Sequence, residues 1–226
     1  MFDINWSEIL LLLPAVIIAL SCHEYAHARV AYSLGDPTAK IQGRMTINPL
    51  RHLDPVGTLM LLFFHFGWAK PVPINPYNFR RVNNKHFGTL LVSLAGPVMN
   101  LLLAVLGSLL MVLLLKGVMP LFSSTGNDTL VSFFINLFYF LLLFSQINIV
   151  LAVFNLIPLP PLDGSKILAG LLPMRWADKF YQYERYGWII MVLLLMTGAL
   201  SRLIGPIIGA FERVIFNITG LSGIMF

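Results

Sequence analysis

Two histidines and a glutamate lie close together near the start of the chain, in the pentapeptide HEYAH at 23–27. On a helix, residues four apart share a face, so His23 and His27 can direct both imidazoles at one metal ion. Glu24 is one step further round the helix, where its carboxylate can accept a proton from an attacking water and later pass it to a leaving amine. The spacing predicts a catalytic zinc site that hydrolyses peptide bonds.

A catalytic zinc ion takes three protein ligands and leaves a fourth position open, so one more ligand must come from elsewhere in the chain. We favour Asp163, which follows a long apolar run and then the proline-broken stretch FNLIPLPPLDG. Prolines open the backbone, and at membrane depth an open backbone is tolerated only beside protein or a cavity. A turn aspartate before Gly164 is the simpler alternative.

Six other residues of the right types are alternatives for this third ligand: Asp36, Asp54, His52, His65, His86 and Glu184. His52 is the second choice, although a solvated loop histidine is its simpler interpretation. Asn155 lies eight residues before Asp163. A buried amide there could donate a hydrogen bond to a tetrahedral oxyanion or to the substrate backbone. Taken alone, a helix-capping or interhelical asparagine is the favoured interpretation of Asn155.

The composition predicts that these residues lie in a membrane protein. Of 226 residues, 58% are hydrophobic and 11% are charged, against about 25% charged residues in a soluble domain. An integral membrane protein is therefore predicted, and in its helices two histidines and a glutamate would be costly unless they served a site. The net charge is +5, but the cations gather in loops between apolar runs, which indicates membrane topology rather than nucleic-acid binding.

The apolar runs predict an all-α polytopic membrane protein forming one domain over residues 1–226, with about four transmembrane helices. The helix that carries the zinc motif is expected at 9–34, and three others are expected at 88–115, 130–157 and 186–203. Residues 35–87 are expected to form a cytoplasmic region with re-entrant parts. Within it, 57–68 is too short to span a bilayer, and the alternation in 38–47 predicts a small β-hairpin. Residues 204–226 are expected to be an interfacial tail.

The positive charges orient this arrangement. Seven Lys or Arg residues lie in 35–87 and four in 158–185, whereas the first eight residues carry none. Because cytoplasmic loops are enriched in Lys and Arg, both basic segments are predicted to be cytoplasmic and the N-terminus to lie outside. HEYAH and Asp163 then share the cytoplasmic leaflet at similar depth, so the topology permits them to meet.

Two other classes of function are compatible with intramembrane histidines. A transporter or ion channel with a metal relay would need more acids in the later helices, which are almost free of them. A non-catalytic membrane protein with a structural zinc would normally fill all four metal positions with Cys or His. The single cysteine, Cys22, is adjacent to His23 rather than four residues away, so it faces another direction. Both alternatives are weaker than hydrolysis.

Three motifs resemble those of the site-2 protease family of intramembrane zinc metalloproteases. HEYAH at 23–27 looks like the family's HExxH, and NLIPLPPLDG at 155–164 looks like its NxxPxPxxDG motif. AGPVMN at 95–100 is similar to its GPxxN element. The stretches NPLRHLDPVGT and GWAKPVPINP look like the short bacterial and archaeal branch, and no PDZ or CBS domain is recognisable. The resemblance runs from about residue 15 to about residue 170.

The resemblance implies one zinc ion per chain on His23, His27 and Asp163, with Glu24 as base and acid and Asn155 as an active-site helper. It implies a multi-pass protein of the cell membrane that cleaves transmembrane or membrane-proximal segments of other membrane proteins, often regulatory ones. Such a substrate must be locally unwound before attack. The expected hairpin at 38–47 could then pair with the extended substrate as an edge strand.

Overall fold

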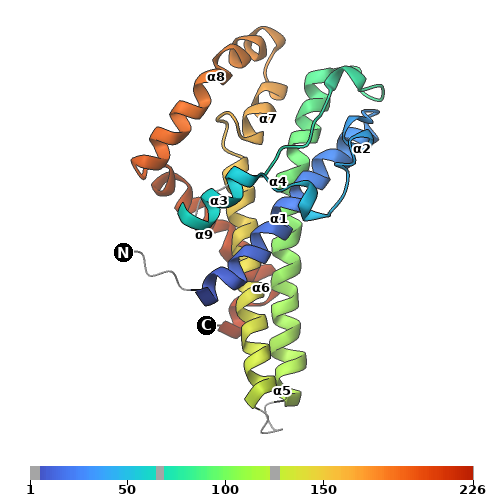
Figure 1. Cartoon of the computed structure of the whole chain (residues 1–226). Coiled ribbons are helices and arrows are strands. Elements are labelled where there is room, and N and C mark those ends of the chain that lie inside the picture. Colours follow the sequence, from blue (N-terminus) through green and yellow to red (C-terminus); the bar gives the residue numbers. More distant parts are fainter. Residues whose placement is uncertain (1–5, 65–68, 123–127, 226) are drawn as a thin grey trace.

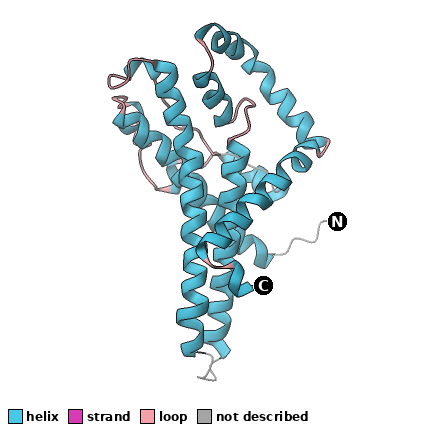
Figure 2. Cartoon of the chain, turned by 180° about the vertical axis from the view of Figure 1, so that it is seen from behind, coloured by secondary structure: helices cyan, strands magenta, loops and turns pink. Residues whose placement is uncertain are grey.

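The computed structural model describes residues 6–64, 69–122 and 128–225, and every regular element in this part of the chain is a helix (Figures 1 and 2). The long helices are α1 (Trp6–Ser33), α4 (Lys85–Leu113), α6 (Asp128–Asn155), α8 (Met174–Met196) and α9 (Ala199–Thr219). The shorter α-helices are α2 (Thr38–Ile41), α3 (Pro55–Phe64), α5 (Met119–Phe122), α7 (Asp163–Leu171) and α10 (Ser222–Met225). Two 3-10 turns, η1 (Pro49–Arg51) and η2 (Pro76–Asn78), and the π-helical turn η3 (Leu114–Val118) complete them.

Three helical segments among the described residues are long and apolar enough to cross a membrane: Leu10–Ser33, Lys85–Val118 and Asp128–Asn155. A fourth span is formed if Arg185–Met196 and Ala199–Thr219 count as one, although they are bent by 81° at their junction. Gly198 allows this bend, because its φ of +66° lies in the left-handed region that favours glycine. The expected count of about four spans is therefore matched by three or four.

Small residues bring the spanning helices together. Ala15 and Ala19 of α1 are fully buried, and a Cβ on Gly107 of α4 would strike Ser145 of α6. In a bilayer, helices associate through close van der Waals packing rather than through the hydrophobic effect, so small side chains lie at their interfaces. Figure 1 shows α1 crossing the long pair α4 and α6. The residues of the zinc motif thus face a packed interior.

The β-hairpin expected at 38–47 is wrong. Thr38–Ile41 forms the short helix α2 and Gly43 turns the chain with a φ of +64°. Asp36 turns the chain just before the helix, because its carboxylate accepts a hydrogen bond of 3.1 Å from the Thr38 N–H. This local turn therefore overrides the weak alternation, and Ala39 is buried. The only β-type pairing among the described residues is an isolated bridge between Leu53 and Ala69.

Residues 69–75 follow that bridge as an extended segment, which we call the strap. Pro71 and Pro73 exclude a regular helix here. Lys70 anchors the strap twice: its N–H donates to the His52 carbonyl at 2.8 Å, and its carbonyl accepts from Arg44 Nη2 at 2.6 Å. At the other end, the Asn75 N–H donates to the Asp36 carboxylate at 2.7 Å. These contacts hold the strap against the polar region that follows α1.

The end of the chain differs in detail from the sequence expectation. α8 begins at Met174, well before the expected 186, and α9 runs as one helix from Ala199 to Thr219. The charged residues between 174 and 185 shortened the apolar run but do not prevent helix formation, because Lys, Arg and Glu have high helix propensity. The predicted short segment at 57–68 is α3 up to Phe64, and its remainder lies outside the described residues.

Candidate metal centre and active site

His23, His27 and Asp163 come together although Asp163 is 140 residues from His23. Asp163 Oδ2 lies 3.1 Å from His23 Nε2 and 3.0 Å from His27 Nε2, and the two Nε2 atoms are 3.0 Å apart. Ligand atoms around a tetrahedral zinc ion are about 3.3 Å apart. The three side chains are at most 12% exposed. Two imidazoles and one carboxylate at these separations fit a zinc ion with an open fourth position.

Hydrogen bonds donated by the Nδ1 atoms orient both imidazoles. The Nδ1 atom of His27 lies 2.7 Å from the Val92 carbonyl oxygen, which can only accept, so His27 must donate through Nδ1. The Nδ1 atom of His23 lies 2.6 Å from Asn100 Oδ1. In both residues Nε2 therefore faces the centre with its lone pair. Metal-binding histidines are typically held in this way by a partner on the far nitrogen.

The GPVMN element of α4 supplies the wall behind the histidines. A Cβ on Gly96 would lie 2.5 Å from His27 Nε2 and 2.6 Å from His23 Nε2. Only glycine therefore allows α4 to approach both imidazoles. Asn100 lies one turn later on the same helix and contacts His23. The sequence showed this element without assigning it a role, and the structure supplies one.

Asp163 is positioned at the first residue of α7. Gly164 is necessary beside it, because a Cβ there would strike the backbone carbonyls of Leu156 and Ile157. The motif's DG pair thus packs the loop closely under the end of α6. A carboxylate binds a metal ion in its charged form, and Asp163 turns its Oδ2 atom toward both Nε2 atoms.

Glu24 stands beside this cluster and is held by the strap. Its Oε2 atom accepts a hydrogen bond of 2.8 Å from the backbone N–H of Val72. The sequence predicted Glu24 at the site but gave no sign of this contact. No side-chain pattern could have revealed it, because the donor is a backbone group.

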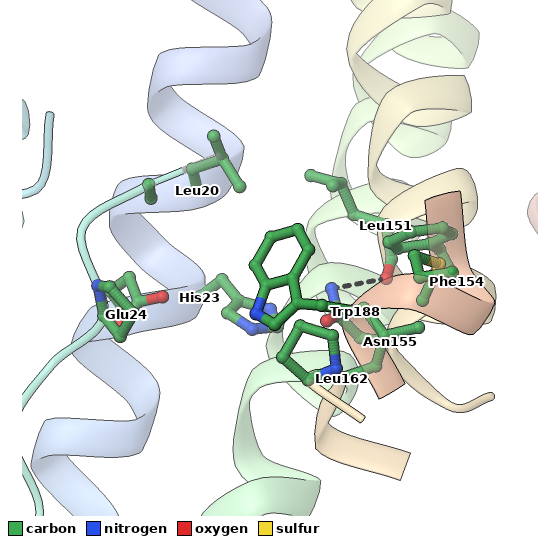
Figure 3. A pocket seen from close by; sticks show the side chains of 12 residues that line it. Leu20, His23, Glu24, Leu151, Phe154, Asn155, Leu162 and Trp188 are labelled. Atoms are coloured by element: carbon green, nitrogen blue, oxygen red, sulfur yellow. Dashed lines mark hydrogen bonds between the residues drawn. The ribbon is translucent and has the colours of Figure 1, made fainter. Parts of the chain in front are cut away.

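Two cavities meet at His23 and Glu24. The first, of about 250 Å³, is lined by His23, Glu24, His27 and Asp163 together with the polar side chains of Thr89 and Lys166. The second, of about 220 Å³, is walled by apolar side chains: Leu20, Leu151, Phe154, Leu162, Trp188 and Met191. Figure 3 shows Leu20 and Glu24 on one side of the second cavity and Leu151 and Asn155 on the other. The first carries more polar side chains than the second, so we call them the polar and the apolar cavity.

Asn155 lines both cavities and lies near His23 and Glu24. Its Nδ2 atom donates to the Leu151 carbonyl of its own helix at 3.0 Å (Figure 3). Asn155 therefore borders the site, and its amide nitrogen is engaged by a carbonyl of its own helix.

Of the remaining candidate ligands, none whose side chain the structure describes joins the cluster. His52 is 1% exposed, and its Nε2 lies 2.6 Å from the Thr46 carbonyl oxygen. The interpretation of His52 as a solvated loop residue is wrong, since it is buried below the strap. Asp36 is likewise buried and accepts hydrogen bonds from Thr38, Asn75 and Asn78. His65 lies outside the described residues. Within the described part, His23, His27 and Asp163 are the one group of three such side chains close enough to share an ion.

Comparison with known proteins places the chain in a family. The family model of "Peptidase family M50" matches residues 11–198. YwhC of Bacillus subtilis, named as a zinc metalloprotease, is 42% identical over 88% of this chain and 86% of its own length. Rip2 of Mycolicibacterium smegmatis, named likewise, is 27% identical over 94% of this chain and 75% of its own length. Rip2 of Mycobacterium tuberculosis is 25% identical over 92% of this chain and 72% of its own length.

No solved structure matches the chain significantly. The family match covers all three motifs, including the histidines and the aspartate of the metal cluster. A buried His, His and Asp cluster, a glutamate beside it and three or four membrane-spanning helices are what a membrane-embedded zinc peptidase requires. This chain therefore belongs to peptidase family M50, the site-2 protease family of intramembrane zinc metalloproteases.

Proposed function

We propose that this protein cleaves transmembrane or membrane-proximal segments of other membrane proteins, at a zinc centre held by His23, His27 and Asp163. The observation that carries the proposal is the depth of this cluster. α1 ends at Ser33, so a rise of 1.5 Å per residue puts His27 about 9 Å and His23 about 15 Å below that end. Peptide bonds reaching this depth belong to segments that enter the bilayer.

The residues of the site divide the chemistry between them. A zinc ion bound there supplies Lewis acidity toward a peptide carbonyl and toward water. Glu24 borders the polar cavity with its carboxylate, where it is placed to accept a proton from water and to deliver it to the departing amine. The Val72 N–H restrains one carboxylate oxygen and leaves the other available for that transfer. Asn155, which borders both cavities, is positioned to hydrogen-bond the substrate near the reacting carbonyl.

The two cavities suggest how an apolar substrate and water reach the same centre. The polar cavity with Lys166 and Thr89 offers water a route to Glu24. The apolar cavity has about 220 Å³, below the roughly 300–1,000 Å³ of pockets that hold whole drug-sized ligands. That space suits one large apolar side chain beside the scissile bond rather than a complete helix. The substrate would therefore present an unwound stretch with a large apolar residue.

The charge distribution supports a cell-membrane protein with its N-terminus outside and its active site in the cytoplasmic leaflet. The metal ligands lie in the parts of α1 and α7 that adjoin the two basic segments, 35–87 and 158–185. Lys and Arg are enriched in cytoplasmic loops. Water and the released product would then exchange with the cytoplasm.

The proposal is tested with full-length protein in liposomes, using a model single-span membrane protein as substrate. Glu24→Gln removes the base but keeps the size of the side chain and all three ligands. We expect it to bind zinc like the wild type and to lose cleavage by roughly 100-fold or more. Asp128→Asn, at the opposite end of α6 from Asn155, is the control and should retain full activity. Full activity in Glu24→Gln would overturn the hydrolytic role.

A further inference from the structure

A line of buried amide groups runs away from the metal centre into the helix bundle. Asn100 of α4, whose Oδ1 contacts His23, donates from Nδ2 to Asn148 Oδ1 of α6 at 2.8 Å. Asn148 in turn donates from its own Nδ2 to the Phe144 carbonyl at 2.8 Å. Both asparagines are fully buried. Asn148 belongs to none of the three motifs described above.

The far end of this line fixes the direction of every hydrogen bond in it. The Phe144 carbonyl can only accept, so Asn148 must turn its NH₂ group toward it. Asn148 then presents its oxygen to Asn100, which must answer with its own NH₂ group. The oxygen of Asn100 is thereby left facing His23, whose Nδ1 must carry the proton. The lone pair of His23 then lies on Nε2, 3.1 Å from Asp163 Oδ2, where a metal would bind.

We propose that Asn148 is a positioning residue for the metal centre, setting the tautomer of His23 through Asn100. Without Asn148, the remaining acceptor for Asn100 Nδ2 is the Ala19 carbonyl at 3.4 Å, beyond the usual 2.7–3.2 Å range. Asn100 could then rotate its amide and donate to His23 Nδ1. That rotation would move the imidazole proton to Nε2 and block metal binding.

A neighbouring residue separates this role from helix packing. Ser145 lies on α6 three residues before Asn148, is fully buried, and also joins α6 to α4 by donating to the Ala104 carbonyl at 3.2 Å. The hydrogen bond of Ser145 involves neither Asn100 nor the histidines. Ser145 thus joins the two helices by a buried hydrogen bond that has no link to His23, whereas Asn148 joins them through the partner of His23.

The test compares zinc dissociation constants of purified full-length variants, measured by competition with a chelator. Asn148→Leu should raise the dissociation constant by roughly 10-fold to 100-fold, as loss of an outer hydrogen bond to a metal ligand does. Ser145→Ala is the matched control: it removes a buried hydrogen bond between the same helices and should leave zinc affinity unchanged. Unfolding temperatures show that both variants are folded, and Asn148→Ala replaces Asn148→Leu if the latter is not.

A second substitution distinguishes the proposed route from a general disturbance. In Asn100→Asp, both side-chain oxygens are acceptors. Rotation of the carboxylate therefore still presents an acceptor oxygen to His23 Nδ1. Asn148→Leu should therefore change zinc affinity by only a few-fold in the Asn100→Asp background. Wild-type affinity in Asn148→Leu, an equal loss in Ser145→Ala, or an undiminished loss in the Asn100→Asp background would overturn the proposal. Zinc affinity is independent of cleavage, so this outcome is separate from that of the proposed proteolysis.

Discussion

The Val72 N–H donates a hydrogen bond of 2.8 Å to the Glu24 carboxylate, across 48 residues of sequence. The strap therefore reaches the active site through its backbone and orients the side chain proposed as the base. The contacts of Lys70 and Asn75 with Arg44, His52 and Asp36 hold the strap on both sides of Val72. Glu24 is thus fixed by a segment whose own position depends on the polar region after α1.

Val72→Pro tests this contact, because proline has no backbone N–H while it tolerates an extended conformation. Loss of the hydrogen bond should misplace Glu24 and lower kcat for a model membrane substrate by roughly 10-fold, with zinc content unchanged. Val72→Ala shortens the same buried side chain but keeps the N–H, so it should be nearly as active as the wild type. Equal losses in the two variants would show that the side chain, not the N–H, matters.

Gly96→Ala should remove metal binding by crowding the imidazoles. The new methyl group would clash with both imidazoles, because it would lie 2.6 Å from His23 Nε2 and 2.5 Å from His27 Nε2. Zinc content measured by mass spectrometry should fall well below one ion per chain. Gly107→Ala is the control: its Cβ would strike Ser145, away from the metal centre. We expect it to lower the unfolding temperature while zinc content stays normal.

Trp188→Ala should change which side chain the protease accepts beside the cut. The substitution enlarges the apolar cavity, so products from a set of model transmembrane substrates should show larger residues at one fixed position. Trp188 is 49% exposed, so the change should leave folding and zinc content intact. Trp176 lies on the same helix, is 61% exposed and does not line the cavity. An identical shift in Trp176→Ala would exclude a specific role for the cavity.

The stabilisation that the Asp36 carboxylate gives to the region after α1 should be lost in acid. Burial acts to raise the pKa of Asp36, but hydrogen bonds from Thr38, Asn75 and Asn78 outweigh burial and hold it below its usual value. The folded state thus binds the proton less tightly than the unfolded state. The stabilisation is complete above the unfolded-state pKa and is lost as the pH falls through the lower folded-state pKa.

Asp36→Asn should therefore lower the free energy of unfolding by about 1–3 kcal/mol at neutral pH. The difference between variant and wild type should shrink in acid below the unfolded-state pKa. Unfolding in detergent followed by tryptophan fluorescence across this pH range measures both quantities. A difference that does not depend on pH would show that the charge of Asp36 contributes nothing.

The expected spans and metal cluster could be predicted because local patterns carried them. HEYAH places two imidazoles on one helical face whatever surrounds it. A charged residue after a proline-broken apolar run is tolerated in a membrane only beside protein groups or a cavity. The region 38–47 was not predicted correctly, because a turn made by the Asp36 carboxylate and the Thr38 N–H outweighs the weak alternation. The burial of His52 depends on its packing below the strap, which no nearby residue specifies.

The sequence by itself determined the chemistry of this protein: the ligand types, the glutamate beside them and an apolar chain that must cross a bilayer. Only the tertiary structure decided how these groups are held. The strap orients Glu24 through a backbone N–H, and Asn148 meets Asn100 from a different helix. Such contacts join residues far apart in the chain, and they follow from the way the helices pack rather than from any local spacing.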